Sequence, residues 1–321
     1  MAHTGPLDQV RDDVWALTMP MPGAHMPYSF AYLLRDSAGG LHVIDPGLDL
    51  DENWGLLGWA LGEIGAGLGG VRSIVATHLH PDHLGMADRL RRATGARLLL
   101  HRAEQEALDA QPSSRLTPET LAARFDEWAV PSDRREEMAA VAVRLPVSVA
   151  VRADAVLEDG ERLDIPGFEL TAIWTPGHTP GSLTLRDDRR SIILTGDHVL
   201  PVTFSGLGLG GATPGNPLAE YLSSLDRVAP FADHEVLPGH EHRFTGLAVR
   251  TDELAEHHLR RSREVASALE ADAAASIWWI ASQLTWTAGW KNLEGFLLFS
   301  ALSQTAMHRE ALEIPAVRAR L

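Results

Sequence analysis

Segment 77–85, which reads THLHPDHLG, constrains this chain more than any other part of its sequence. It places three imidazoles and one carboxylate within six positions, at His78, His80, Asp82 and His83. Imidazole nitrogens and a carboxylate oxygen together suit a divalent ion such as zinc, iron or manganese. The spacing does not match the i, i+3 and i+4 positions of one helix face, so we expect a loop. Residues 71–77 have strand composition and residues after His83 look helical, which is a usual place for a site in an α/β protein.

Three further ligand-type residues follow short apolar runs elsewhere in the chain. In each case a strand-like run stops at a Pro/Gly turn signal, and a His or Asp follows. A histidine-rich surface loop is the alternative for segment 77–85 alone, but several strand ends that deliver His or Asp to one place predict a metal site. The three residues are His178 after run 168–174, Asp197 after run 191–195, and His240 after run 236–237.

These motifs resemble the metallo-β-lactamase superfamily, and most closely its glyoxalase II-like branch of broad hydrolases. The resemblance runs from Val14 to Thr245, and segment 78–83 matches the family motif His-x-His-x-Asp-His in full. It implies an α/β fold, namely a four-layer αβ/βα sandwich, with a helical insertion and a small C-terminal helical domain.

The resemblance also implies how the ligands divide between two metal ions. One ion would be held by three histidines, the second by a mixed set, and a carboxylate would bridge them. Zinc is the favoured metal, with manganese or iron as alternatives. The family's early Asp-x-Gly turn matches Asp45, which would support the metal loop from outside the ligand shell. The first set is His78, His80 and His178, the second is Asp82, His83 and His240, and the bridge is Asp197.

The activity that the resemblance implies is metal-dependent hydrolysis of an ester-like bond in a small molecule: a thioester, an ester or a lactone. A hydroxide shared by the two ions would attack the acyl carbon, because metal coordination lowers the pKa of water. One ion would stabilise the oxyanion. Asp82 would be the catalytic residue that orients the nucleophile and passes a proton to the leaving group. Ser182 lacks the context of a nucleophile elbow, so no serine nucleophile is expected.

Several other activities stay open as alternatives. A mononuclear iron sulfur dioxygenase of the same superfamily is one, although seven ligand-type residues favour two metals. A phosphodiesterase or nuclease is disfavoured by the formal net charge of −15, which repels phosphate backbones. A β-lactamase is disfavoured because the chain has no cysteine, a common ligand in the zinc β-lactamases. A non-catalytic scaffold would not need the complete ligand set.

The 321 residues allow one large domain and a smaller one. We expect a catalytic domain over residues 1–250 and a helical, winged-helix-like domain over 251–321. Residues 102–152 predict a helical insertion, interpreted as a lid over the site, with a packing or dimer element as the alternative. Residues 250–321 carry eight basic and nine acidic side chains, a poor charge balance for reading DNA.

Candidate substrate contacts lie in two loops. The first is placed near the metals in the family, with an ordinary hairpin turn as the alternative, and the second directly follows Asp197. His25 and Tyr28 lie in the loop over residues 20–29, and Phe204 lies in a glycine-rich loop over residues 199–217, together with Leu207 and Leu209. We expect a small-molecule substrate, no nucleic acid and no membrane partner, and we leave a homodimer open. The chain has no apolar run of about 18 residues and no apolar signal core before residue 13, so a cytoplasmic location is expected.

Overall fold

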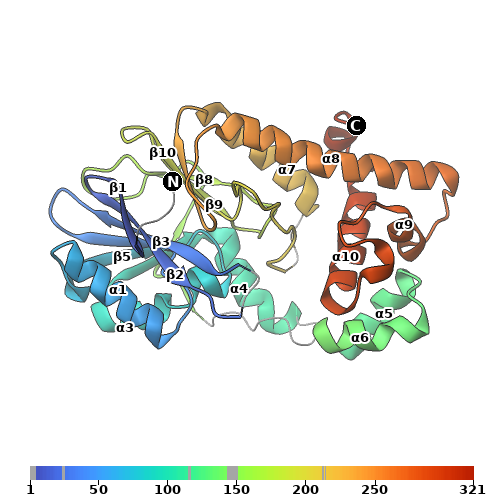
Figure 1. Ribbon diagram of the computed structural model, residues 1–321, viewed down its shortest axis with the longest axis horizontal. Helices are drawn as coiled ribbons and strands as arrows, with labels where there is room; N and C mark the ends of the chain where they lie inside the picture. The colour runs from blue at the N-terminus through green and yellow to red at the C-terminus, as the bar shows by residue number, and fades with distance from the viewer. Residues whose placement is uncertain (1–4, 24–25, 115–116, 143–150, 212, 214) are drawn as a thin grey trace.

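The computed structural model describes residues 5–23, 26–114, 117–142, 151–211, 213 and 215–321. Two β-sheets lie face to face, helices cover the outer face of each sheet, and a body of further helices stands beside this sandwich (Figure 1). The predicted four-layer α/β architecture is therefore confirmed. None of the helices in the described part of the chain is both long and apolar enough to cross a bilayer.

The first sheet has seven strands in sequence order, antiparallel from β1 to β4 and parallel from β4 to β7. Successive side chains of a strand point to opposite faces. In β3, Phe30 and Tyr32 therefore enter the core between the sheets, while Ala31 and Leu33 face the outer helices. The strands are β1 (Leu7–Arg11), β2 (Val14–Pro20), β3 (Tyr28–Arg35), β4 (Leu41–Ile44), β5 (Val71–Val75), β6 (Arg97–His101) and β7 (Ala155–Leu157).

The second sheet has four strands in the order β11-β10-β9-β8. Ile192 and Leu194 of β10 face the first sheet, and Ile193 faces the helices on the other side. Strands β10 and β11 are parallel, and the other pairs are antiparallel. The strands are β8 (Thr171–Trp174), β9 (Leu183–Asp187), β10 (Ile192–Gly196) and β11 (Glu235–Pro238).

Helices on both outer faces complete the four layers. Leu57 of α1, Leu90 of α3 and Leu108 of α4 pack on the first sheet, and Leu222 of α7 and Leu254 of α8 pack on the second. The helices of the first sheet are α1 (Asp51–Glu63), α2 (Pro81–Leu84), α3 (Ala87–Thr94) and α4 (Arg102–Ser114), those of the second sheet are α7 (Pro217–Val228) and α8 (Leu247–Ala271), and short 3-10 turns lie at Leu68–Gly70, Ala229–Phe231 and Trp290–Asn292.

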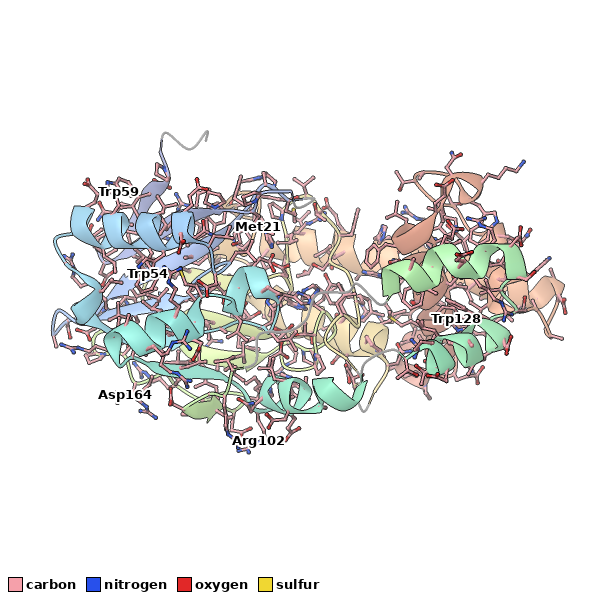
Figure 2. The ribbon with its side chains drawn as sticks, turned by 90° about the horizontal axis from the view of Figure 1, so that it is seen from below. Met21, Trp54, Trp59, Arg102, Trp128 and Asp164 are labelled. Carbon is pink, nitrogen blue, oxygen red and sulfur yellow. The ribbon has the colours of Figure 1, made fainter. Side chains whose placement is uncertain are left out.

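The predicted insertion leaves the sandwich and joins the C-terminal helices. Figure 2 shows Arg102, at the start of α4, on the sandwich and Trp128 inside the neighbouring helical body. The Trp128 carbonyl accepts a hydrogen bond from the Trp278 backbone N–H at 3.0 Å. The Arg134 guanidinium donates to the Leu293 carbonyl at 2.9 Å. The insertion thus packs on the C-terminal helices, and its role as a lid stays a prediction. The helical body contains α5 (Pro118–Glu127), α6 (Ser132–Ala142), α9 (Ile277–Gln283) and α10 (Gly295–Ala311), with α11 (Pro315–Arg318) after them.

The expected domain boundary at residue 250 falls inside a helix. The first half of α8 packs on the second sheet through Leu254 and Leu259, and its second half packs near α9 through Val265 and Ala268. Residues 251–321 form helices and 3-10 turns without a strand, so the wing implied by the resemblance is absent there. The apolar side of α10 is covered instead by α6, α8 and α9.

We expect Phe125→Ala to destabilise the helical body by about 3–5 kcal/mol, because it removes a buried ring from the core that α5 shares with α9 and α10. Denaturant unfolding followed by tryptophan fluorescence measures the loss. Phe296→Ala is the control, since that ring is 44% exposed and its removal should cost no more than about 0.5 kcal/mol. Equal small effects of the two variants would contradict the packing of α5 on these helices.

Candidate metal centre

Five strands end at the same edge of the sandwich, and the candidate ligands follow four of them. Segment 77–85 follows β5, segment 175–182 follows β8, Asp197 follows β10, and His240 comes after β11. Strands β8, β10 and β11 run in one direction, so their carboxyl ends meet at one edge. Asp45 follows β4 at this edge. The structure thus brings together all seven residues that the sequence singled out.

Three imidazoles form the first group, His78, His80 and His178. The Nε2 atoms of His78 and His178 lie 3.0 and 3.1 Å from Nδ1 of His80. Oδ2 of Asp197 lies 3.7 Å from Nε2 of His178. The ligand atoms of these four residues all lie within 4.8 Å of one another, the spacing of a metal site.

Two imidazoles and a carboxylate form the second group, Asp82, His83 and His240. The Nε2 atoms of His83 and His240 are 3.2 Å apart, and Oδ2 of Asp82 lies 3.3 Å from Nε2 of His240. Oδ1 of Asp197 lies 3.3 Å from each of these two nitrogens. The two oxygens of Asp197 therefore face different groups.

The short distances between ring nitrogens test whether a metal ion fits. Two nitrogen lone pairs at this separation repel unless a proton or a cation lies between them. In a tetrahedral zinc site with Zn–N bonds of about 2.0–2.1 Å, ligand nitrogens lie about 3.3 Å apart, close to the values found here. Oδ1 of Asp197 is buried and has no hydrogen-bond partner among the described residues. An ion in each group would satisfy both the nitrogens and this oxygen, so the residues fit divalent metals.

Burial and neighbouring charges set the ionisation of the two groups. Burial lowers the pKa of all three imidazoles of the first group, that of His80 to about 4, which keeps them in the neutral form that binds metals. Burial alone would lower the pKa of His240 too, but the carboxylates of Asp197 and Asp82 raise it to about 10. The second group therefore attracts positive charge strongly.

Hydrogen bonds from the outer nitrogens hold the imidazoles in place. Asp45, with a φ of 54°, accepts from the Thr77 backbone N–H and hydroxyl at 2.7 Å each, and its Oδ2 lies 2.9 Å from Nδ1 of His83. This is the supporting role expected for Asp45. Such partners fix the ring orientation and leave the other ring nitrogen directed at the metal position.

Backbone carbonyls give the same support to three of the other histidines, and Nδ1 of His78 lies 3.0 Å from the Thr77 hydroxyl. Nδ1 of His178 lies 2.6 Å from the Gly206 carbonyl, Nε2 of His80 lies 3.1 Å from the Leu209 carbonyl, and Nδ1 of His240 lies 2.8 Å from the Tyr28 carbonyl. Sequence reasoning missed these contacts, because every residue has a carbonyl and none carries a signal.

The predicted substrate contacts lie in different surroundings. Tyr28 lies beside the second group, and its hydroxyl donates to the Glu241 carbonyl at 2.6 Å. Phe204 instead stacks on His257 of α8, with ring centroids 3.8 Å apart. Leu207 is buried against the second sheet and its helices. Leu209 is 49% exposed, and its backbone contacts both His80 and His178 of the first group. His25 lies outside the described residues.

Two carboxylates near the ligands were also missed. Glu241, next to His240, accepts hydrogen bonds from the backbone of Val202 and Thr203 and so anchors the loop after Asp197. Glu104 lies at the start of α4, and its carboxylate contacts the segments that carry His80 and His178. Neither belongs to a motif, so no spacing could have indicated them.

The family model of the Metallo-beta-lactamase superfamily matches residues 27–240, which include all seven candidate ligands. The chain belongs to this superfamily. The predicted family is thereby confirmed, and a His/Asp metal-binding cluster lies where the fold brings its strand ends together.

Relatives with assigned names point to the glyoxalase II-like branch. The chain is 30% identical to acyl-coenzyme A thioesterase MBLAC2 of Bos taurus over 197 residues, which cover 59% of this chain and 62% of that protein. It is 27% identical to hydroxyacylglutathione hydrolase of Methylobacillus flagellatus over 64% of each chain. It is 24% identical to probable metallo-hydrolase YqjP of Bacillus subtilis over 94% of this chain and 92% of that one. The chain thus spans less than two thirds of the MBLAC2 thioesterase.

Solved structures resemble almost the whole chain. A metallo-beta-lactamase family protein from Thermus thermophilus covers 95% of this chain and 94% of its own, with 25% identity and a TM-score of 0.73. A beta-lactamase domain protein from Burkholderia ambifaria covers 96% and 88%, with 22% identity and a TM-score of 0.75. The fold of the chain, helical body included, is therefore shared with these proteins.

We expect His178→Ala and Asp82→Ala each to lower the metal content of the protein, because one ligand is removed from the first or the second group. Elemental analysis after gel filtration in zinc-containing buffer measures the content. His242→Ala is the matched control, because this histidine lies two positions after His240 but is exposed. Full metal content in both His178→Ala and Asp82→Ala would show that the ligands are assigned wrongly.

Proposed function

We propose that this protein is a dinuclear metallohydrolase that cleaves an ester-like bond of a small molecule, with a thioester as the first candidate. The observation that carries the proposal is the position of Asp197. Its two oxygens face two separate groups, each with enough nitrogen and oxygen ligands for one divalent ion. A single iron site, as in a sulfur dioxygenase, would leave the second group without a role.

The seven residues would hold two divalent ions, which when bound supply a nucleophile from water at neutral pH and polarise the acyl oxygen. The protein contributes orientation and proton transfer. Asp82 is more exposed than Asp197, with 19% of its side chain accessible against 12%. We assign to Asp82 the orientation of the attacking water and the transfer of a proton to the leaving thiolate or alkoxide.

The names of two relatives support a thioester. One is an acyl-coenzyme A thioesterase, and the other is a hydroxyacylglutathione hydrolase. The formal net charge of −15 disfavours a phosphodiester of a nucleic acid.

An apolar acyl group would suit the entrance to the first group. Leu209 is held by backbone contacts on both sides, with its N–H donating to the His178 carbonyl at 2.9 Å and its carbonyl near Nε2 of His80 at 3.1 Å. We infer that its exposed side chain contacts the acyl group of a substrate whose carbonyl lies at the metals. Burying such a side chain against an acyl chain contributes about 1.5–3 kcal/mol.

A hydrolysis panel on zinc-loaded protein tests the reaction class. We expect turnover of an activated thioester or a lactone, loss of turnover after a chelator, and recovery on addition of zinc, with little action on β-lactams and phosphodiesters. Native protein with one iron per chain and oxygen consumption with a persulfide would instead establish a dioxygenase.

Leu209→Asp should raise KM for a long-chain acyl thioester by about tenfold or more, because an apolar contact is replaced by a charge. The kcat for an acetyl thioester should change little, since only backbone atoms of Leu209 contact the ligands. Steady-state kinetics over a series of acyl lengths measures the difference. Leu297→Asp, at an exposed site of α10, is the control. An equal rise in KM for short and long acyl groups would contradict an acyl contact at Leu209.

A further inference from the structure

Glu104 is a fully buried carboxylate that lies outside the set of candidate ligands, in the first turn of α4. It accepts three hydrogen bonds. Oε1 accepts from the Leu79 backbone N–H at 2.6 Å and from the Thr179 hydroxyl at 2.8 Å, and Oε2 accepts from the Gly181 backbone N–H at 2.6 Å. These three donors therefore belong to two loops at the metal centre.

The two loops come from different sheets. Leu79 lies between His78 and His80 in the loop after β5 of the first sheet. Thr179 follows His178 in the loop after β8 of the second sheet. The first ligand group exists only if these loops keep a fixed separation, and Glu104 bonds to both of them.

The contact between α4 and the second loop leaves no spare room. A Cβ atom on Gly181 would lie 2.2 Å from the backbone nitrogen of Glu104 and 2.5 Å from its Cβ. Only glycine permits this approach. Within the same loop the Ser182 hydroxyl lies 2.7 Å from the Thr179 hydroxyl, so this donor to Glu104 is itself held in place.

Burying this carboxylate is unfavourable by itself. Its three hydrogen-bond donors are two backbone N–H groups and a hydroxyl, none of them cationic, and burial raises the pKa of Glu104 to about 7 although these bonds oppose the rise. An isolated buried carboxylate costs free energy that an apolar residue would avoid. The presence of Glu104 is explained if the metal site needs the loop separation that this carboxylate imposes.

We propose that Glu104 is a positioning residue of the first metal site. It sets the separation of the two loops so that the nitrogens of His78, His80 and His178 converge on one ion. It does not touch the ion or the substrate. This inference rests on the metal centre proposed above, but not on the identity of the substrate.

Zinc titration of the metal-free protein against a chromophoric chelator tests the role. In Glu104→Ala, the affinity for one of the two ions should fall about 10–100-fold, the range found when a partner of a metal ligand is removed, while the other ion binds nearly as in the unaltered protein. Glu104→Gln should give an intermediate loss. Its amide oxygen can still accept from Leu79 and Thr179, but its NH2 group would oppose the Gly181 N–H.

Asp36→Ala is the matched control for a merely structural effect. This buried carboxylate accepts from the backbone N–H groups of Ala38 and Gly40 at 2.8 Å, at the opposite end of β4 from Asp45. The Asp36→Ala variant should have a lower melting temperature in the metal-free protein, as Glu104→Ala does, but both of its zinc affinities should be unchanged.

Unchanged zinc affinities in Glu104→Ala, or an equal loss in Asp36→Ala, would overturn the proposal. If Glu104→Ala does not fold, Glu104→Gln decides by the same criterion. Two bound ions with the expected loss in the variant, but no hydrolysis of any thioester, ester or lactone, would contradict the proposed function alone. Thioester hydrolysis with unchanged affinities in Glu104→Ala would contradict the positioning role alone.

Discussion

The carboxylate of Asp197 lies between two groups of imidazoles, and much of the surrounding structure serves to hold the partners of this carboxylate at the right distance. A buried anion with one oxygen directed to each group is stable only with positive charge on both sides. The sandwich provides this arrangement because strands of both sheets end at one edge. Each sheet supplies part of the ligand set, and neither sheet could hold a complete site alone.

This division creates a mechanical requirement, since the two sheets must keep a fixed relation at the edge where they meet. Hydrogen bonds between loops satisfy this requirement. The carbonyl of Tyr28 in β3 reaches His240 after β11, and Glu104 joins the loops after β5 and β8, so both contacts link the two sheets. Asp45 fixes the loop after β5 within the first sheet. These contacts are directional, so they orient imidazoles more narrowly than apolar packing does.

The helical body is joined to the sandwich by one long helix. Helix α8 packs on the second sheet with one half and near α9 with the other, so it connects the two parts as one continuous element. In Figure 1 it runs from the sandwich across to the C-terminal helices. The insertion containing α5 and α6 then completes the core of this body. Segments far apart in the sequence therefore share one apolar core.

From the sequence alone, the strand-end pattern indicated all seven ligand-type residues, and the resemblance carried by these motifs implied the family and the four layers. Strand composition, turn signals and histidine spacing are local properties, and the motif at 78–83 is specific. Only the tertiary structure decided that α5 and α6 pack on the C-terminal helices, that Leu209 rather than Phe204 lies at the ligands, and that Glu104 joins two loops. The physical reason is that these contacts depend on which surfaces meet. A buried glutamate on a helix and a carbonyl in a loop have no spacing or composition that distinguishes them before the chain has folded.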